Sequence, residues 1–363
     1  MKILLVQDIL RSGGTERQTV RLANAFSAAG HRSVLLTFRP GGRLAGTVDD
    51  GVERIVLQPF DLGIDWFAPG LSREVRRAAP DIVLCMGRMA NCHAGAVQDA
   101  LDPGRPAAVV ATMRTGKPLP WLFRRSLHRV RHIVANSREA RDALVREHRI
   151  PGERITVIHN SLVFPPGNAK DRNTALRATQ GATDQTTVML CVAMFRPEKN
   201  QRELIEIVAG LPPSTDWQLW LAGDGPARAA CERFVLSRKL GRRVRFPGFQ
   251  ADPSPLYDAA DLAVHASWSE ALSNFLIEAQ AHGLPAVAFE ARGIRECVLP
   301  DETGWVIPRG DRAAFRAALE REMRRPPATR AMIAASARNF ARATFDPARQ
   351  VDAHLDLFTR LLT

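Results

Sequence analysis

The sequence lacks several patterns that identify common protein classes. Its five cysteines include no C-x-x-C spacing, and no cluster of His and Cys has the spacing of a metal site. An odd number of cysteines without such spacing is typical of a reducing compartment, where thiols stay free. No apolar run approaches the roughly 18 residues that a membrane-spanning helix needs. The apolar start MKILLVQDIL is interrupted by Gln7 and Asp8, which favours a buried strand over a signal peptide.

Aromatic residues are scarce, and this scarcity limits the choice of anionic partners. The net charge of +12 favours nucleotide phosphates, an anionic membrane surface or nucleic acid. The chain has a single Tyr, and no tract interleaves Lys or Arg with aromatic residues. Nucleic acid is therefore the partner that we expect least.

What the sequence does contain is a repeated alternation of apolar strands and amphipathic helices. A strand is predicted over 2–6, Gly13-Gly14 follows, and a helix over 15–29 precedes the next strand at 33–38. This βαβ unit indicates a parallel sheet with its functional loops at the carboxyl ends of the strands. Further strands are predicted at 54–57, 81–86, 107–113, 132–136 and 157–160.

A polar stretch over 165–185 predicts a linker without secondary structure, and a second alternating series follows it. A final helix over 347–362 places Val351, Leu355 and Phe358 on one face. The 363 residues therefore predict two Rossmann-like, doubly wound α/β domains in tandem. If these domains face each other across a cleft, the ligand is expected in that cleft. Strands of the second domain are predicted at 187–194, 217–222, 243–247, 261–266, 284–289 and 304–307.

Two glutamates in the segment SEALSNFLIEAQAHG, Glu270 and Glu278, follow a predicted strand at the start of a helix. Ionised carboxylates only accept hydrogen bonds, so they suit the hydroxyls of a sugar or a ribose. Eight helical residues rise about 12 Å, whereas the paired carboxyl groups of a glycoside hydrolase lie roughly 5–9.5 Å apart. The spacing thus favours contacts with two ends of one extended ligand. The alternative is a solvated helix start, where the helix dipole favours acidic residues.

Arg196 and Lys199 lie in the segment FRPEKN, directly after a predicted strand. Two cations at this point can bind a diphosphate and stabilise it as it leaves. The alternative is a solvated turn with Asn200 as a helix N-cap. The segment GDGP at 223–226 is interpreted as a tight turn. Phe249 and Gln250 are placed to contact a base, and a packing role is the alternative for Phe249.

In the first predicted domain, the Gly13-Gly14 pair allows backbone N–H groups to approach a phosphate. The pair is not part of a G-x-G-x-x-G pattern, which disfavours a nicotinamide-dependent dehydrogenase. His93, in GRMANCHAG, is a candidate contact to the acceptor or the donor. Its alternative is a histidine packed within a helix.

Several segments taken together resemble glycosyltransferase family 4, whose members are retaining enzymes of the GT-B fold. They are GGTERQ, NSREARDALV, VIHN, FRPEKN, AGDGP, FPGF and SEALSNFLIEAQAHGLPAVAF followed by TGWVI, in the family's order over nearly the whole chain. The resemblance implies an acceptor-side domain over 1–164 and a nucleotide-sugar-binding domain over 165–345. It also implies a terminal helix over 346–363 that crosses back to the first domain.

The resemblance implies roles for individual residues. Arg196 and Lys199 match the cationic pair that binds the donor diphosphate, and Glu270 matches the glutamate near the hydroxyls of the donor sugar. These three residues are the predicted catalytic set, and Glu278 matches the glutamate that holds the ribose. The other predicted donor contacts are Gly14, Phe249, Leu272, Ser273 and Asn274.

The sequence departs from the family pattern in the first domain. Many members have a His after the strand that matches 109–113, but this chain reads Met113-Arg114-Thr115. Arg114 is accordingly a candidate charge beside the diphosphate, and a His contact to the donor sugar is not assumed. Asn160-Ser161 replaces the usual Asn-Gly after the VI-x-N strand, which is expected to alter only a turn.

The resemblance implies a metal-independent, hexosyltransferase-type enzyme without a cofactor, which uses a nucleotide-diphosphate sugar as co-substrate. The expected acceptor is a glycan or lipid-linked acceptor of bacterial envelope polysaccharide, lipopolysaccharide or glycolipid synthesis, in the cytoplasm. One alternative is a non-hydrolysing sugar-nucleotide epimerase of the same architecture, which turns over without an acceptor. A non-enzymatic module that binds a nucleotide sugar or nucleic acid is the other.

Residues 121–132 combine basic side chains with a predicted apolar stripe of Leu122, Phe123, Leu127 and Val130. This pattern favours peripheral contact with the anionic inner face of a membrane. An ordinary surface helix that packs its apolar stripe is the alternative.

Overall fold

The computed structural model describes residues 1–104, 106–164 and 172–363, which form two compact units. The first unit consists of residues 1–161 and 347–363, and the second unit of residues 162–346. Part of the predicted linker, residues 165–171, lies outside the described residues. Each unit is a parallel β-sheet covered by helices, as the fold prediction stated.

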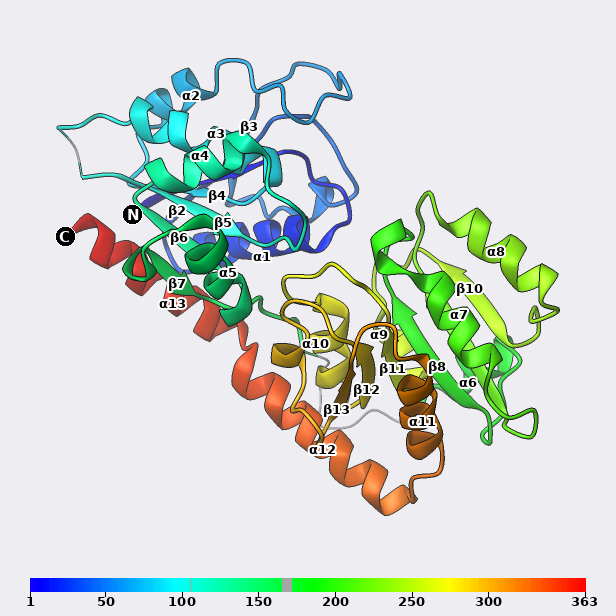
Figure 1. Ribbon diagram of the computed structural model, residues 1–363. Helices are drawn as coiled ribbons and strands as arrows, with labels where there is room; N and C mark the ends of the chain where they lie inside the picture. The colour runs from blue at the N-terminus through cyan, green and yellow to red at the C-terminus, as the bar shows by residue number, and fades with distance from the viewer. Residues whose placement is uncertain (105, 165–171) are drawn as a thin grey trace. The chain divides into compact units, whose positions relative to one another are not determined.

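The first unit contains a seven-stranded parallel sheet in the order β3-β2-β1-β4-β5-β6-β7 (Figure 1). Its strands are largely continuous apolar runs, because both faces of a parallel sheet are covered. The strands are β1 (Lys2–Gln7), β2 (Arg32–Thr37), β3 (Glu53–Val56), β4 (Ile82–Cys85), β5 (Ala108–Met113), β6 (His132–Ala135) and β7 (Ile155–Val157).

Helices cover both faces of the first sheet. The buried side chains of α1 (Gly14–Ala28) and α13 (Pro347–Leu362) pack on one face. On the other face lie α2 (Leu71–Ala78), α3 (Arg88–Ala100), α4 (Trp121–Arg129) and α5 (Arg138–His148). Two short 3₁₀ helices, η1 (Ala45–Thr47) and η2 (Gly152–Arg154), complete the unit's helical elements among the described residues.

The second unit contains a six-stranded parallel sheet in the order β10-β9-β8-β11-β12-β13. All its neighbouring strands are parallel, so every connection within the sheet is a crossover. The strands are β8 (Thr187–Val192), β9 (Trp217–Ala222), β10 (Val244–Gly248), β11 (Leu262–His265), β12 (Ala286–Phe289) and β13 (Gly304–Ile307).

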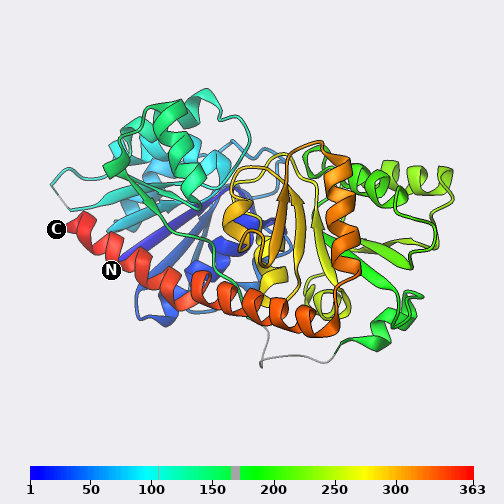
Figure 2. The same cartoon turned by 60° about the horizontal axis from the view of Figure 1, so that its bottom comes forward.

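Helices also form two layers on the second sheet. One layer contains α6 (Thr174–Thr179), α9 (Ser254–Ala259), α10 (Asn274–Ala281) and part of α12 (Pro327–Thr344). Helix α12 packs along α10 (Figure 2). The other layer contains α7 (Gln201–Ala209), α8 (Arg228–Ser237) and α11 (Arg312–Met323). The 3₁₀ helices of this unit are η3 (Pro197–Lys199) and η4 (Arg295–Cys297).

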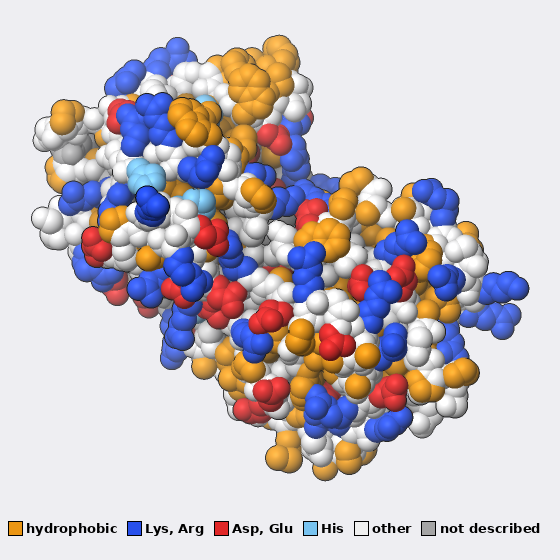
Figure 3. All heavy atoms as spheres, in the orientation of Figure 1, with side chains coloured by type: hydrophobic (Ala, Val, Ile, Leu, Met, Phe, Trp, Pro, Cys, Tyr) orange, Lys and Arg blue, Asp and Glu red, His pale blue; other side chains and the backbone are white. Residues whose placement is uncertain are grey.

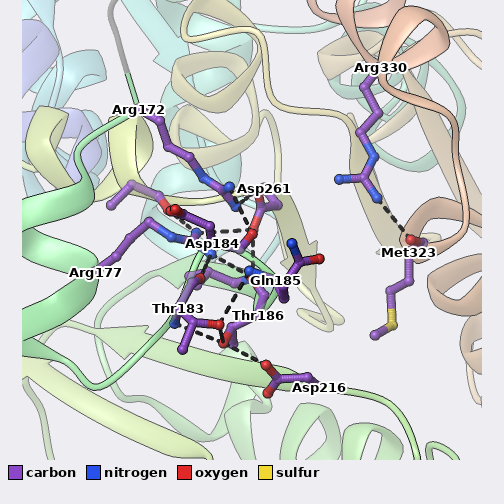
Figure 4. A network of polar contacts seen from close by, with 12 residues as sticks. Arg172, Arg177, Thr183, Asp184, Gln185, Thr186, Asp216, Asp261, Met323 and Arg330 are labelled. Carbon is purple, nitrogen blue, oxygen red and sulfur yellow. Dashed lines mark hydrogen bonds and ion pairs between the residues drawn. The ribbon is translucent and has the colours of Figure 1, made fainter.

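The predicted linker is wrong over its second half, because α6 and the residues after it are folded parts of the second unit. The buried Arg177 guanidinium organises this segment (Figure 4). It donates hydrogen bonds to the carbonyls of Thr183, Thr186 and Ala259. It also pairs with Asp261, whose carboxylate accepts from Val188 N at 2.8 Å. This polar stretch is therefore a folded segment, and Arg177 bonds several parts of it together.

Two other predictions need correction. The strand predicted at 157–160 is β7 over Ile155–Val157, so Asn160 lies in the loop after it. The apolar stripe predicted for membrane contact is mostly buried, because Phe123, Leu127 and Val130 belong to the core of the first unit. Of that stripe only Leu122 is exposed, beside Trp121. The packing alternative for this stripe is therefore the correct one.

The sheet topology determines where a ligand can bind in each unit. The strand order reverses between β1 and β4 in the first sheet and between β8 and β11 in the second. In open parallel sheets, ligands bind outside the carboxyl ends of the strands at such a reversal. No helix within the described parts of the chain combines the length and apolar character of a membrane span.

Candidate active site

The loops after β8 and β11 meet at the strand-order reversal of the second sheet. They cover residues 193–200 and 266–273. The carbonyl of Glu198 joins them, because it accepts hydrogen bonds from Trp268 N at 3.1 Å and from Ser267 Oγ at 3.0 Å. Side chains from the two loops are thereby held together at the carboxyl edge of the sheet.

Lys199, Glu270 and His265 come together at this edge. Glu270 Oε1 lies 2.5 Å from Lys199 Nζ and 2.8 Å from His265 Nε2. His265 is the last residue of β11 and is buried, as is Glu270. Glu270 Oε2 has no hydrogen-bond partner among the described residues, and this atom is not fully buried. This second oxygen is therefore open to solvent.

The electrostatics of this cluster hold Glu270 in its ionised form. Burial acts to raise the pKa of Glu270, but the Lys199 ammonium and the hydrogen bond from His265 outweigh it and lower the pKa to about 2. His265 donates through Nε2, and its buried Nδ1 has no partner among the described residues. The site thus presents a fixed carboxylate whose open oxygen is an acceptor for a ligand hydroxyl.

Arg196 differs from Lys199 in its surroundings. Glu270 neutralises Lys199, whereas the Arg196 guanidinium makes no hydrogen bond or ion pair with any described residue. Arg196 is half-buried and precedes η3, on the same loop as Lys199. Because a guanidinium binds phosphate oxygens in a bidentate manner, Arg196 is the cation of this loop that is available to an anionic ligand.

The GDGP segment supports this loop through close backbone packing. Gly223 and Gly225 have φ values of 139° and 145°, which side chains rarely adopt. A Cβ at Gly223 would lie 2.1 Å from the carbonyl oxygen of Ala193, and one at Gly225 would lie 2.4 Å from that of Phe195. The glycines are thus required for the turn to pack against the loop that carries Arg196 and Lys199.

Phe249 and Gln250, which were predicted to contact a base, follow β10 at the edge of the sheet. Strand β9 separates β10 from β8, so these residues lie two strands from the strand-order reversal. Phe249 is half-buried, and Gln250 Nε2 donates to the carbonyl of Pro247 at 2.9 Å. Their contact with a base stays a prediction.

Glu278 lies on α10, and Glu270 lies in the loop before it. The predicted spacing of about 12 Å assumed eight continuous helical residues between the two glutamates. Helix α10 begins only at Asn274, so this assumption is wrong. Tyr257 Oη donates to Glu278 Oε2 at 2.7 Å. Glu278 Oε1 has no hydrogen-bond partner among the described residues and is not fully buried, so it is open as well.

The start of α10 contains the predicted backbone contacts at Leu272, Ser273 and Asn274. Ser273 is the N-cap of α10, and its Oγ accepts from Leu276 N at 3.4 Å. Its own N–H donates to Cys297 Sγ at 3.3 Å, so this amide would have to exchange partners to bind a ligand. Ligand contact by the three amides stays a prediction.

In the first unit, Gly14 opens α1, so its N–H belongs to the first turn, where the helix offers no acceptor. Arg114 directly follows β5, and its Nη1 donates to Asn160 Oδ1 at 2.5 Å. Its Nε and Nη2 are buried without a partner among the described residues, and burial lowers the pKa of Arg114 to about 10. Arg114 thus has two buried donors without a partner, which is rare in native structures, and its contact with a diphosphate stays a prediction.

His93 is committed to a structural contact. Its Nε2 lies 3.0 Å from the carbonyl oxygen of Trp66, and its ring packs edge-on against Phe38 at 5.5 Å. These contacts hold the loop after β3 against α3. They match the alternative interpretation of His93 as a packed histidine, and contact with the acceptor or donor stays a prediction.

Sequence reasoning missed His265, Tyr257 and Asp8. His265 donates a hydrogen bond to Glu270, and Tyr257 donates one to Glu278. The available sequence signal for His265 was a polar residue at the end of the apolar run LAVH. The signal for Tyr257 was that it is the only Tyr of the chain. Asp8 follows β1 at the strand-order reversal of the first sheet. It accepts from Met89 N and Ala90 N, and burial raises the pKa of Asp8 to about 6.

Comparisons with known proteins identify the family of the chain. Residues 12–162 match the family described as Glycosyltransferase Family 4, and residues 186–324 match the family described as Glycosyl transferases group 1. The chain is 33% identical over 144 residues to the lipopolysaccharide core biosynthesis glycosyltransferase LpsE of Rhizobium meliloti, covering 40% of this chain and 42% of that protein. It is 30% identical over 235 residues to D-inositol 3-phosphate glycosyltransferase of Corynebacterium diphtheriae, covering 60% and 54%. The chain thus spans about half the length of these relatives.

Solved structures show the same fold. Anabaena HepE in complex with UDP-glucose superposes with a TM-score of 0.81 at 22% sequence identity, covering 99% of this chain and all of that one. At this level of identity the likeness concerns the fold, which is that of GT-B glycosyltransferases.

Proposed function

The chain belongs to glycosyltransferase family 4, and we propose on this basis that it transfers a sugar from a nucleoside-diphosphate donor to an acceptor hydroxyl with retention of configuration. The observation that carries the proposal is the cluster of Lys199, Glu270 and His265 at the strand-order reversal of the second sheet. This cluster places a cation and an open carboxylate oxygen where parallel sheets bind ligands.

Separate side chains bind separate parts of the donor. Arg196 and Lys199 contact the diphosphate, where a guanidinium and an ammonium neutralise phosphate charge. Glu270 Oε2 accepts a hydrogen bond from a hydroxyl of the sugar, and Glu278 Oε1 accepts one from the ribose. The N-terminus of α10 contributes backbone N–H groups to the phosphates and the sugar.

The proposed chemistry is the retaining transfer that the family resemblance implies. The bond between the anomeric carbon and the diphosphate oxygen breaks, and the acceptor oxygen forms a bond to the same carbon on the same face. The acceptor proton passes to the departing phosphate oxygen. Arg196 and Lys199 stabilise the negative charge that develops on the diphosphate, so we expect turnover to persist in EDTA.

The identity of the donor and of the acceptor is proposed from the relatives. HepE has been solved with UDP and with UDP-glucose, which makes UDP-sugars the first donors to test. LpsE acts in lipopolysaccharide core biosynthesis, as its name states. We therefore propose a glycan or lipid-linked acceptor of the bacterial envelope, glycosylated in the cytoplasm.

Thermal stabilisation by a panel of nucleoside diphosphates and nucleotide sugars tests the donor proposal. A ligand at 100 times its dissociation constant stabilises the folded protein by about 2.7 kcal/mol, which raises the melting temperature measurably. The sugar nucleotide that binds is then incubated with the protein, and the released or transferred sugar is followed by proton NMR. Retained anomeric configuration supports the proposal, whereas inversion contradicts it. Release of an epimerised sugar nucleotide without an acceptor would favour the epimerase instead.

Peripheral contact with an anionic membrane is the second part of the proposal, on a surface other than the predicted stripe. Residues 103–138 contain no Asp or Glu. Within this tract α4 exposes Trp121 and Leu122 at its start and Arg124 and Arg125 in its first turn, with Arg125 lying over the Trp121 ring. Figure 3 shows Lys and Arg side chains beside hydrophobic ones on the visible face of the first unit. An aromatic residue bordered by arginines suits an interface of anionic headgroups.

Flotation with vesicles of anionic and of neutral phospholipid tests this contact. Binding is expected to the anionic vesicles only and to weaken with salt, because the arginines are exposed. Replacing Arg124 and Arg125 with Gln, together with Trp121→Ser, is expected to abolish flotation. An equally exposed pair, Arg242 and Leu236 in the second unit, supplies the control as Arg242→Gln with Leu236→Ser. Flotation of the wild-type protein with neither vesicle would exclude the membrane contact.

A further inference from the structure

The two ligand-facing glutamates share one arrangement. Each has one carboxylate oxygen held by a side chain of the second unit, and each has its other oxygen open. Glu270 Oε1 accepts a hydrogen bond from His265 Nε2 at 2.8 Å and another from Lys199. Glu278 Oε2 accepts one from Tyr257 Oη at 2.7 Å. We propose that His265 and Tyr257 are positioning residues, which orient the open oxygen of each glutamate toward the donor. The inference rests on the proposed donor site.

Tyr257 is held too tightly to serve as an adaptable contact. It is buried on α9, and its ring lies 6.2 Å from that of Phe275 and 4.8 Å from that of His282. His282 is itself fixed, because its Nδ1 lies 2.8 Å from Asp258 Oδ1. The only tyrosine hydroxyl of the chain therefore lies at a defined point beside Glu278.

His265 is fixed by the sheet. It is paired with Ala288 of β12 in the strand register, and its ring lies 5.7 Å from that of Phe275. Phe275 thus packs against the rings of both positioning residues. Phe275 lies on α10 between the two glutamates in sequence, so one aromatic side chain contacts both hydrogen-bond donors.

This arrangement reduces the cost of donor binding. A glutamate that rotates freely loses side-chain entropy when it accepts a hydrogen bond, whereas a carboxylate held by one oxygen has lost that freedom already. The two donors act on different glutamates, so their removal should have different consequences. Loss of the Tyr257 hydroxyl affects the nucleotide part of the ligand, and loss of the His265 donor affects the sugar part.

Calorimetric titration with UDP and with UDP-glucose, or with the nucleotide pair that stabilises the protein most, measures this separation. Tyr257→Phe is expected to weaken binding of both ligands about tenfold, since one hydrogen bond to a charged group is lost. His265→Phe is expected to weaken the binding of UDP-glucose about tenfold and the binding of UDP about twofold or less. His265→Gln keeps an N–H donor and is expected to restore most of the affinity for UDP-glucose.

Thr186→Val is the matched control. Thr186 Oγ1 also donates to a carboxylate, that of Asp216 at 2.8 Å, but at the opposite edge of the same sheet (Figure 4). Its loss should leave both affinities unchanged. A merely structural role of His265 would change both affinities by the same factor. A merely structural role of Tyr257 would lower the melting temperature and leave both affinities unchanged in the protein that remains folded.

The outcomes separate this inference from the function on which it rests. If the wild-type protein binds no nucleoside diphosphate and no sugar nucleotide of the panel, the proposed function is overturned. If the wild-type protein binds and the variants bind equally well, only the positioning roles are overturned. The positioning role of His265 is also overturned if His265→Phe weakens the binding of UDP as much as the binding of UDP-glucose.

Discussion

Replacing Lys199 with Met should lower the stability of the second unit. Replacing Glu270 with Gln in the same chain should restore that stability. The pKa of Glu270 is lowered from 4.5 to about 2, and at about 1.4 kcal/mol per unit this corresponds to about 3 kcal/mol of stability at neutral pH. Because the folded pKa is lowered, this contribution is present above pH 4.5 and is lost as the pH falls toward 2.

Lys199→Met leaves the Glu270 carboxylate buried with His265 as its remaining donor. Removing one partner of a buried ion pair costs about 3–5 kcal/mol, and because 24% of the Lys199 side chain is exposed, we expect the lower part of this range. Glu270→Gln in the same chain removes the unpaired charge, so the coupling between the two sites should be about 2 kcal/mol.

Urea unfolding at pH 7, followed by tryptophan fluorescence, measures these changes, since four of the six tryptophans lie in the second unit. Lys239→Met is the control, because Lys239 is exposed and makes no contact with an acidic residue of the described chain. The double variant should regain stability but not turnover, which separates the proposed catalytic role of Lys199 from its structural one. A double variant no more stable than Lys199→Met would refute the account of the ion pair.

Three further predictions concern other residues. Burial lowers the pKa of His354 to about 4, so the wild-type protein should lose stability as the pH falls from 6.5 toward 4, and His354→Leu should reduce this slope in thermal unfolding. Gly293 has a φ of 74°, and Gly293→Ala would place a Cβ 1.9 Å from the carbonyl oxygen of Ala271. This change should destabilise the loop that carries Glu270 and abolish nucleotide binding. As a control, a Cβ at Gly241 meets no atom within 4 Å, so Gly241→Ala should be neutral. Arg196→Ala should leave the melting temperature unchanged and weaken nucleotide binding by about tenfold to hundredfold in calorimetry.

The strands were predictable from sequence because both faces of a parallel sheet are buried. Runs such as KILLV and WQLWLA have no solvent-facing side, so their apolar character marks the strand directly. The carboxyl ends of these strands then located Arg196, Lys199 and Glu270 at one edge of one sheet.

Contacts that depend on tertiary packing were not predictable in this way. Helix α6 lies in a stretch that is polar in sequence, and the partners of its Arg177 are spread from Thr183 to Asp261. The pairing of Tyr257 with Glu278 links α9 to α10 through the core, and no local pattern specifies it. Helix α10 begins at Asn274, after the Ser273 cap, whereas the sequence prediction placed Glu270 at the start of the helix.

The stripe of α4 illustrates a further limit. An amphipathic helix has the same periodicity whether its apolar side covers a core or a membrane. Burial of Phe123 and Leu127 in the first unit decides between the two, and the sequence does not contain that information.

Calorimetric titration of the wild-type protein and of Arg196→Ala with UDP, GDP, ADP and dTDP in EDTA tests the central claim most directly. The account predicts that at least one nucleoside diphosphate binds the wild-type protein without a metal ion, and that Arg196→Ala binds it at least about tenfold more weakly. Absence of binding to all four, or equal binding by the two proteins, would contradict the donor site at the carboxyl edge of the second sheet.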